Sequence, residues 1–132
     1  MSTEGVKDVF ITDGSVDGNV FLYFVRKQLL PIIKPFDGYN SKSVVVMDNA
    51  AIHHVDSVVA CINSVGALVR FLPPYSPDKN PIESVFSEVK QYLQANDLIF
   101  HTTLSMNIIL LMAFNSVSRE NCLSYIEYPG YA

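Results

Sequence analysis

The amino-acid sequence predicts an α/β fold with a largely parallel sheet, and three observations support this prediction. Residues 43–47 form a continuous run rich in β-branched side chains, which is typical of a strand buried on both faces of a helix-covered sheet. Short apolar runs alternate with segments whose apolar residues recur at helical spacing. Gly and Pro stand between these segments, so the predicted order is strand, helix, strand, helix, strand, loop, helix, helix.

The first half of the chain contains two of the predicted strands. Residues 8–11 are a short apolar run followed by two Asp-Gly pairs, which predicts a strand and a turn. Apolar residues recur at helical spacing over 21–33, and we expect this helix to stop within the proline-containing segment 31–35. A loop is expected at 37–40, before the central strand at 43–47.

The second half supplies the third strand and the remaining helices. A helix is predicted over 53–65 and a strand over 68–72, while the prolines of 73–78 predict an ordered loop. Asn80 and Pro81 suit the N-cap and the first position of the next helix. The apolar stripe of that helix consists of Ile82, Val85, Phe86, Val89 and Leu93.

The C-terminal part of the chain is expected to form one more helix, at roughly 104–117. The tail beyond it is expected to pack as a cover and contains Tyr125, Tyr128 and Tyr131. The most apolar stretch, 104–114, is eleven residues long, which is too short to span a bilayer.

The composition of the 132 residues favours a single domain with a real core and excludes several classes of protein. Apolar residues make up 49% and charged residues 17%, which argues against disorder. Cys61 and Cys122 have no Cys or His at ligand spacing, so neither a zinc site nor a disulfide framework is expected, and the pattern fits a reducing compartment. The formal net charge of −4 opposes extensive phosphate binding unless a local basic patch supplies the attraction.

Asp48 and Glu83 are the candidate catalytic and metal-binding acids. Asp48 follows the central strand directly, and ligand sites in open α/β sheets gather at the carboxyl ends of strands, although Asp also caps turns into helices. Glu83 lies three residues after Asn80, a spacing that equally fits a capping box. Lys90 lies two turns after Glu83 on the same side of the helix, where it meets either a phosphate or only solvent.

Two long strings place these acids in a wider context. Residues 44–54 read VVVMDNAAIHH, and residues 72–83 read LPPYSPDKNPIE. The chain closely resembles the DDE domain of the Tc/mariner superfamily of transposases and its bacterial insertion-sequence relatives, from about Asp8 to the Gly130-Tyr131 end. The 34 residues between the two acids, 49–82, match a separation found in that superfamily.

The resemblance implies a ribonuclease H-like fold and a DDE superfamily endonuclease that cleaves DNA and transfers strands in transposition, integration and recombination. In this family three acids hold two divalent ions, Mg²⁺ or Mn²⁺, which activate the attacking oxygen and stabilise the leaving one. Carboxylate oxygens suit Mg²⁺ because it prefers hard ligands. The resemblance makes Asp48 the second acid and Glu83 the third, and a two-ion site is expected only in a complete domain.

The first acid of the family has no counterpart in register. Only 47 residues precede Asp48. The candidates for the first acid among them are Asp8, Asp13, Asp17 and Asp37. Asp13 falls where relatives carry a glycine-rich turn. We therefore expect an N-terminally truncated, partial fold that lacks its first strands, and loss of activity in the isolated chain, because the acids of such a constellation act as a unit.

Several further residues are candidates for contacting DNA. Asn49 and His53 match the family's motif after the second acid, where they either orient Asp48 and touch DNA or form the polar cap of a helix. The basic candidates are Arg70, Lys79 and Lys90, each a weak signal on its own.

Three functions remain open from the sequence: a DDE transposase-like nuclease, a non-catalytic remnant that binds nucleic acid or protein, and a Mg²⁺-dependent hydrolase of small phosphoesters. The specific string at 72–83 argues against the third. The expected partners are DNA and, in a homodimer, a second copy of the chain, with no membrane and no small-molecule cofactor. The resemblance implies a nuclear location, although no basic localisation cluster is visible.

Overall fold

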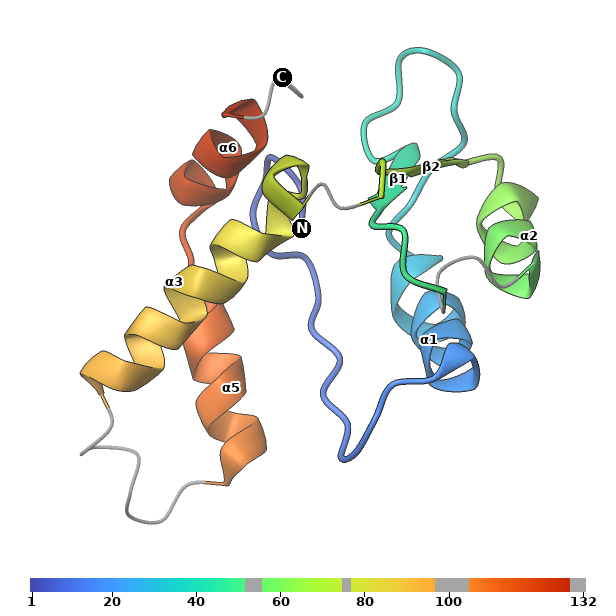
Figure 1. Ribbon diagram of the computed structural model, residues 1–132. Helices are drawn as coiled ribbons and strands as arrows, with labels where there is room; N and C mark the ends of the chain where they lie inside the picture. The colour runs from blue at the N-terminus through green and yellow to red at the C-terminus, as the bar shows by residue number, and fades with distance from the viewer. Residues whose placement is uncertain (52–55, 75–76, 97–104, 129–132) are drawn as a thin grey trace. The chain divides into compact units, whose positions relative to one another are not determined.

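The computed structural model describes residues 1–51, 56–74, 77–96 and 105–128. The chain divides into two compact units (Figure 1). The sheet unit is Thr12–Pro77, and the helical unit combines Met1–Ile11 with Asp78–Ala132. The cores of the two units share no residue, so each unit is described by itself, and the single-domain expectation stays a prediction.

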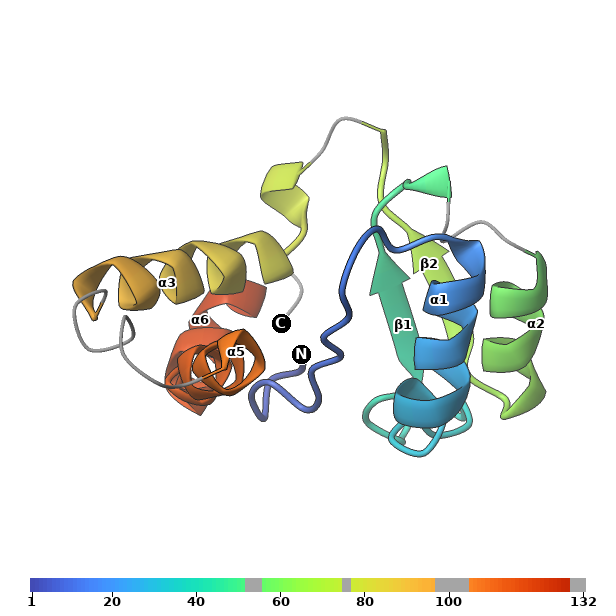
Figure 2. The same ribbon diagram turned by 90° about the horizontal axis from the view of Figure 1, so that it is seen from below.

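The sheet unit contains a βαβ arrangement. Strands β1 (Val44–Met47) and β2 (Leu68–Phe71) pair in parallel, with Val44 opposite Leu68. Helix α2 (Asp56–Ser64) forms the crossover that parallel strands require. The predicted mixed α/β class with a parallel sheet is thus confirmed for these residues (Figure 2).

The first helix begins and ends earlier than the predicted 21–33. Helix α1 (Gly18–Phe24) continues as one turn of π-helix, η1 (Val25–Leu29). It begins early because the Asp17 side chain accepts a hydrogen bond from the backbone N–H of Val20 at 2.9 Å. It ends early because Pro31 cannot donate a helical hydrogen bond.

The core of the sheet unit lies on one face of the sheet. Val25, Val58 and Ile62 are fully buried and pack with Met47, while Val44 and Val46 are 41% and 40% exposed. The prediction that this strand is buried on both faces is wrong. The helices pack against the face that carries Val45 and Met47, and alternation along the strand leaves Val44 and Val46 on the other, exposed face.

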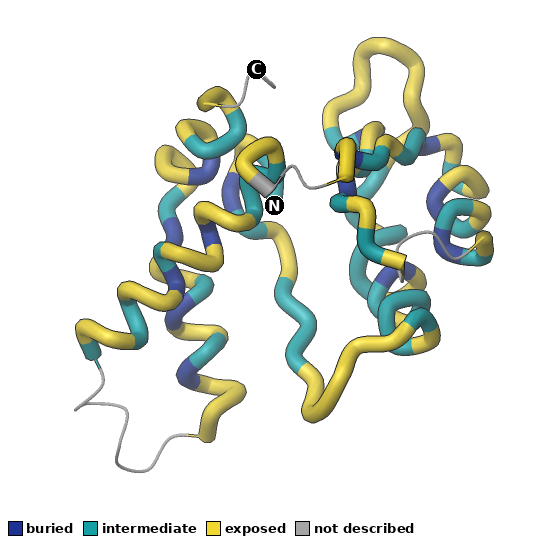
Figure 3. The backbone as a smooth tube through the Cα atoms, in the orientation of Figure 1, coloured by how far each residue is buried: buried dark blue, intermediate teal, exposed yellow. Residues whose placement is uncertain are grey.

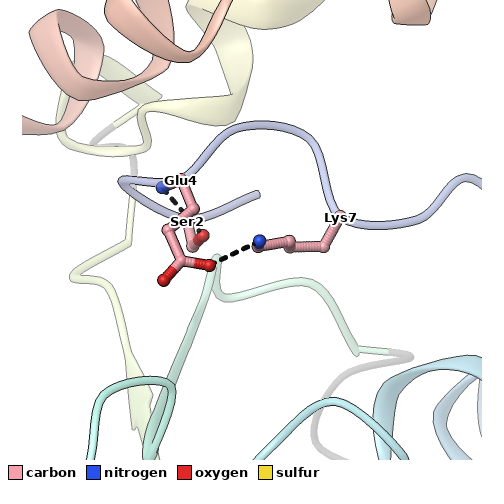
Figure 4. Close-up of polar contacts among 3 residues, drawn as sticks. All are labelled: Ser2, Glu4 and Lys7. Carbon is pink, nitrogen blue, oxygen red and sulfur yellow. Dashed lines mark hydrogen bonds and ion pairs between the residues drawn. The ribbon is translucent and has the colours of Figure 1, made fainter.

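Residues 8–11 do not form the predicted strand. The regular pairing near them is an isolated bridge, in which Ser2 and Gly5 exchange backbone hydrogen bonds of 2.9 and 3.0 Å. The backbone N–H of Glu4 donates to Ser2 Oγ, and the Glu4 carboxylate forms an ion pair with Lys7, with 2.6 Å between Oε2 and Nζ (Figure 4). An apolar run becomes a strand only beside a partner. Among the residues that the structure describes, no strand lies beside this segment.

The described residues of the helical unit form the N-terminal segment and the helices α3 (Ile82–Ala95), α5 (Met106–Asn115) and α6 (Arg119–Glu127). Helix α3 is preceded by the 3-10 turn η3 (Pro77–Lys79). The core residues they share are Val85, Val89, Ala113, Val117 and Cys122. No helix in the described segments is long and apolar enough to cross a membrane.

The C-terminal tail forms a helix, α6, which the sequence analysis did not predict. Tyr125 is half-buried against the core, as expected of a cover, but Tyr128 is 92% exposed. Tyr131 lies outside the described residues. The remaining helix and strand boundaries agree with the predictions to within three residues. The first residues of the predicted 53–65 helix, 53–55, lie outside the described residues.

Candidate metal and nucleic-acid site

Asp48 lies at the carboxyl end of β1 and is half-buried. Its Oδ1 atom accepts a hydrogen bond from the backbone N–H of Ala50 at 3.1 Å, which orients the chain as it leaves the strand. The turn role considered for this residue is therefore real. It does not compete with a ligand role, because an ionised carboxylate has about four acceptor positions.

Glu83 is the second residue of α3 and is exposed. The helix starts at Ile82, so its N-cap position is Pro81 rather than the predicted Asn80, and Pro81 makes no side-chain cap bond. Asn80 still bonds the helix start, because its Oδ1 accepts from Ile82 N–H at 3.3 Å and its carbonyl accepts from Glu83 N–H at 3.1 Å. A capping box also needs the Glu side chain to bond back to the cap residue. Within the described part of the chain, the Glu83 carboxylate contacts no such partner, so the box is only half formed.

The basic candidates lie on three different elements. Lys90 is exposed and follows Glu83 by two turns of α3, as expected. Lys79 ends η3 and is also exposed. Arg70 lies within β2 opposite Val46, on the uncovered face of the sheet, and its guanidinium donates to the Val69 carbonyl at 2.9 Å.

The sheet unit contains Asp48, the exposed Asn49 beside it, and Arg70. The helical unit contains Glu83, Lys79 and Lys90. His53, Tyr75 and Ser76 lie outside the described residues. Among the residues that are described, no three His, Cys, Asp or Glu side chains gather as a metal site.

Three of the carboxylates considered as the missing first acid accept hydrogen bonds from nearby backbone N–H groups. Asp8 accepts from the N–H of Val9 at 2.8 Å, and Asp17 caps α1. Asp37 accepts from the N–H groups of Asn40 and Tyr39, and these bonds lower the pKa of its carboxyl. Asp13 is exposed in the segment before α1. That none of these four carboxylates replaces the first acid stays a prediction.

Charge in the sheet unit is distributed along the strand axis, a feature that the sequence analysis did not identify. Asp17, Asp48 and Asp56 lie at the α1 start, the β1 end and the α2 start, which share one end of a βαβ unit. The opposite end carries the basic residues Arg26, Lys27, Lys34 and Lys42. The signal in the sequence is the scarcity of acids between Asp17 and Asp48.

Comparison with known families gives one result that bears on this site. The family model described as DDE superfamily endonuclease matches residues 1–104. That range contains both Asp48 and Glu83 and ends before α5. No curated protein matches the chain.

Proposed function

The chain belongs to the DDE superfamily endonucleases, and from this premise we propose that it is a transposase-like domain of the Tc/mariner type, with a ribonuclease H-like fold. Its reaction is divalent-metal-dependent cleavage and strand transfer at DNA phosphodiester bonds. The observation that carries this proposal is that the family match covers both Asp48 and Glu83.

Asp48 and Glu83 are the residues that would hold Mg²⁺ or Mn²⁺. The donor chemistry fits, because both supply hard carboxylate oxygens, Asp48 at a strand end and Glu83 on an exposed helix start. A bound ion supplies Lewis-acid stabilisation of charge on phosphate oxygens and lowers the pKa of a bound water. That both acids serve one centre rests on the resemblance and on their spacing in the sequence.

The remaining predicted site residues position DNA. We propose that Asn49 and His53 orient Asp48 or contact the nucleic acid, and that Lys79, Lys90 and Arg70 neutralise phosphates. A homodimer and a nuclear location are part of the same proposal, since both follow from the resemblance.

Two acids alone hold a divalent ion loosely, so we expect the isolated 132-residue chain to cleave DNA weakly or not at all. The competing function is a non-catalytic module that binds nucleic acid or a protein. The half-formed capping box favours the metal function, because it leaves the Glu83 carboxylate without a structural role among the described residues.

Binding of Mn²⁺, followed by the electron paramagnetic resonance signal of the free ion, tests the proposal without requiring turnover. We expect Asp48→Asn and Glu83→Gln each to weaken Mn²⁺ binding about tenfold or more. Glu120→Gln is the matched control, because Glu120 is also the exposed second residue of a helix, α6, and lies outside the family match.

Nicking of supercoiled plasmid DNA in Mg²⁺ or Mn²⁺ completes the test. Any nicking should require the metal and disappear in Glu83→Gln but persist in Glu120→Gln. Equal Mn²⁺ affinity in all variants, together with metal-independent DNA binding and no nicking, would replace the nuclease proposal by the binding module.

A further inference from the structure

The sheet unit carries a basic end that the proposed metal chemistry does not use. The chain has nine Lys and Arg and thirteen Asp and Glu, yet residues 18–47 contain four of the basic residues and one of the acids. This stretch therefore has a formal charge of +3 within a chain of −4. The basic residues are Arg26, Lys27, Lys34 and Lys42.

Two of these cations, Lys34 and Lys42, lie near the two ends of a loop whose base is closed by a backbone hydrogen bond. The N–H of Lys34 donates to the Lys42 carbonyl at 3.0 Å, which closes the loop 34–43 at its base. The N–H of Phe36 donates to the carbonyl of Gly66 at 2.8 Å, which ties the loop to the end of α2. We call residues 34–43 the tyrosine loop.

Side chains fix the tip of the tyrosine loop as well. One carboxylate oxygen of Asp37 accepts from the N–H groups of Tyr39 and Asn40, both at 2.8 Å. The Asn40 amide donates to the Pro35 carbonyl at 3.1 Å, and the Ser43 hydroxyl donates to the Asn40 carbonyl at 2.8 Å. The single acid of the loop is thus turned toward backbone N–H groups.

Tyr39 stands on this fixed tip with 94% of its surface exposed. An aromatic ring on an ordered loop is a platform for stacking, because its position costs little conformational entropy when a partner binds. Figure 3 shows the loop between η1 and β1 as almost wholly exposed. Figure 2 shows β1 pointing away from it, so the loop lies at the end of the sheet opposite to Asp48.

We propose that the tyrosine loop is a second nucleic-acid contact, in which Tyr39 stacks on an unpaired DNA base and the neighbouring cations bind the flanking phosphates. Proteins that bind single strands combine cations along the backbone with aromatic platforms for the bases. Residues 18–47, which contain the loop, have a formal charge of +3, and this favours a polyanion over a neutral or basic partner. That the nucleic acid is DNA rests on the proposed function.

The test is fluorescence anisotropy of a labelled 20-nucleotide oligothymidylate with the full chain, in low salt and EDTA. We expect Tyr39→Ala to weaken binding about five- to tenfold, since stacking on a protein ring contributes that much or more per base. Tyr39→Phe keeps the ring and should bind within about twofold of the wild type. Tyr128→Ala is the matched control, because Tyr128 is 92% exposed in the helical unit.

The cations have their own readout in the salt dependence of binding. Lys34→Gln should reduce the slope of log K against log salt by about 0.7, the value for one phosphate contact on a single strand. Lys7→Gln, which removes a lysine already paired with Glu4, should leave the slope unchanged.

The outcomes separate this inference from the proposed function. Oligonucleotide binding that is unchanged in Tyr39→Ala, or reduced equally in Tyr39→Phe, overturns the stacking role even if Glu83-dependent metal binding is found. An absence of oligonucleotide binding by the wild type overturns it too. Tyr39-dependent binding without any effect of Asp48→Asn or Glu83→Gln on Mn²⁺ keeps the loop contact and rejects the nuclease.

Discussion

At the scale of single residues, the start of α3 contains one side chain that bonds the helix backbone, Asn80, and one that does not bond it among the described residues, Glu83. Asn80 satisfies the backbone N–H of Ile82, whereas Glu83 returns no bond to the cap in the described part of the chain. We expect Asn80→Ala to lower the free energy of unfolding by about 1 kcal/mol. Glu83→Gln should change it by no more than about 0.5 kcal/mol, because only a weak interaction with the helix dipole is lost.

Urea denaturation measures both changes, with Glu120→Gln as the control for an acid at the same position of another helix. A loss in Glu83→Gln as large as that in Asn80→Ala would mean that the capping box forms in solution. The Glu83 carboxylate would then have a structural role and would not be available to bind a metal ion.

Sequence patterns at the residue scale identified Asp48 and Glu83 as candidates but could not decide between their alternatives. The prolines and the N-cap signal place Glu83 at a helix start. A Glu at this position fits either a capping box or a metal ligand, so its residue type does not decide between the two roles. The hydrogen bonds of Asn80 show that this residue bonds the helix start without a return bond from the Glu83 side chain among the described residues. For Asp48, the bond to Ala50 shows that the turn role and the strand-end position coexist.

At the scale of elements, α6 is held to α3 by one carboxylate. Glu88 accepts hydrogen bonds from the Asn121 amide at 3.0 Å and from the Tyr125 hydroxyl at 2.8 Å. The bond to Glu88, followed by burial, raises the pKa of Tyr125 above its ordinary value of 10.0. The protonated phenol therefore stabilises the fold fully below pH 10, and this contribution disappears as the pH rises through the folded pKa.

We expect Tyr125→Phe to lower the free energy of unfolding by about 1 kcal/mol at pH 7, the usual value of such a bond. The difference between variant and wild type should shrink as the pH rises above 10. Urea denaturation at pH 7 and pH 11 measures it, and the exposed Tyr128→Phe is the control. A difference that persists at pH 11 would contradict the hydrogen-bond explanation.

Helices and strands could be predicted where several local sequence signals agreed. They were missed where the local pattern was weak or where a strand depends on a partner distant in the sequence. The helix at α3 was identified because cap, proline and apolar stripe coincide. Helix α6 was missed because its sequence, RENCLSYIE, has little amphipathic pattern, although Ser118 caps it by accepting from Asn121 N–H at 3.1 Å. Residues 8–11 have strand-like composition, yet strand formation depends on a neighbour that sequence patterns do not reveal.

At the scale of the whole molecule, the chain has two separate cores. Ile62 is fully buried in the sheet unit and Val85 is 1% exposed in the helical unit. We expect Ile62→Ala, which costs about 2 to 5 kcal/mol, to speed amide hydrogen exchange in β1 and β2. Val85→Ala should do the same for α3 and α5. Hydrogen exchange with mass spectrometry locates each effect, and loss of protection throughout the chain in both variants would indicate one cooperative unit.

The opposite placement of acids and bases in the sheet unit gives that unit an electric dipole along its strands. A polyanion that comes within a screening length, about 8 Å at physiological salt, exerts a torque on such a dipole. This torque favours encounters in which the lysine-rich end of the sheet unit faces the polyanion. Added salt should therefore slow association more than it speeds dissociation, and orientation would be a kinetic property of the fold before any specific contact exists.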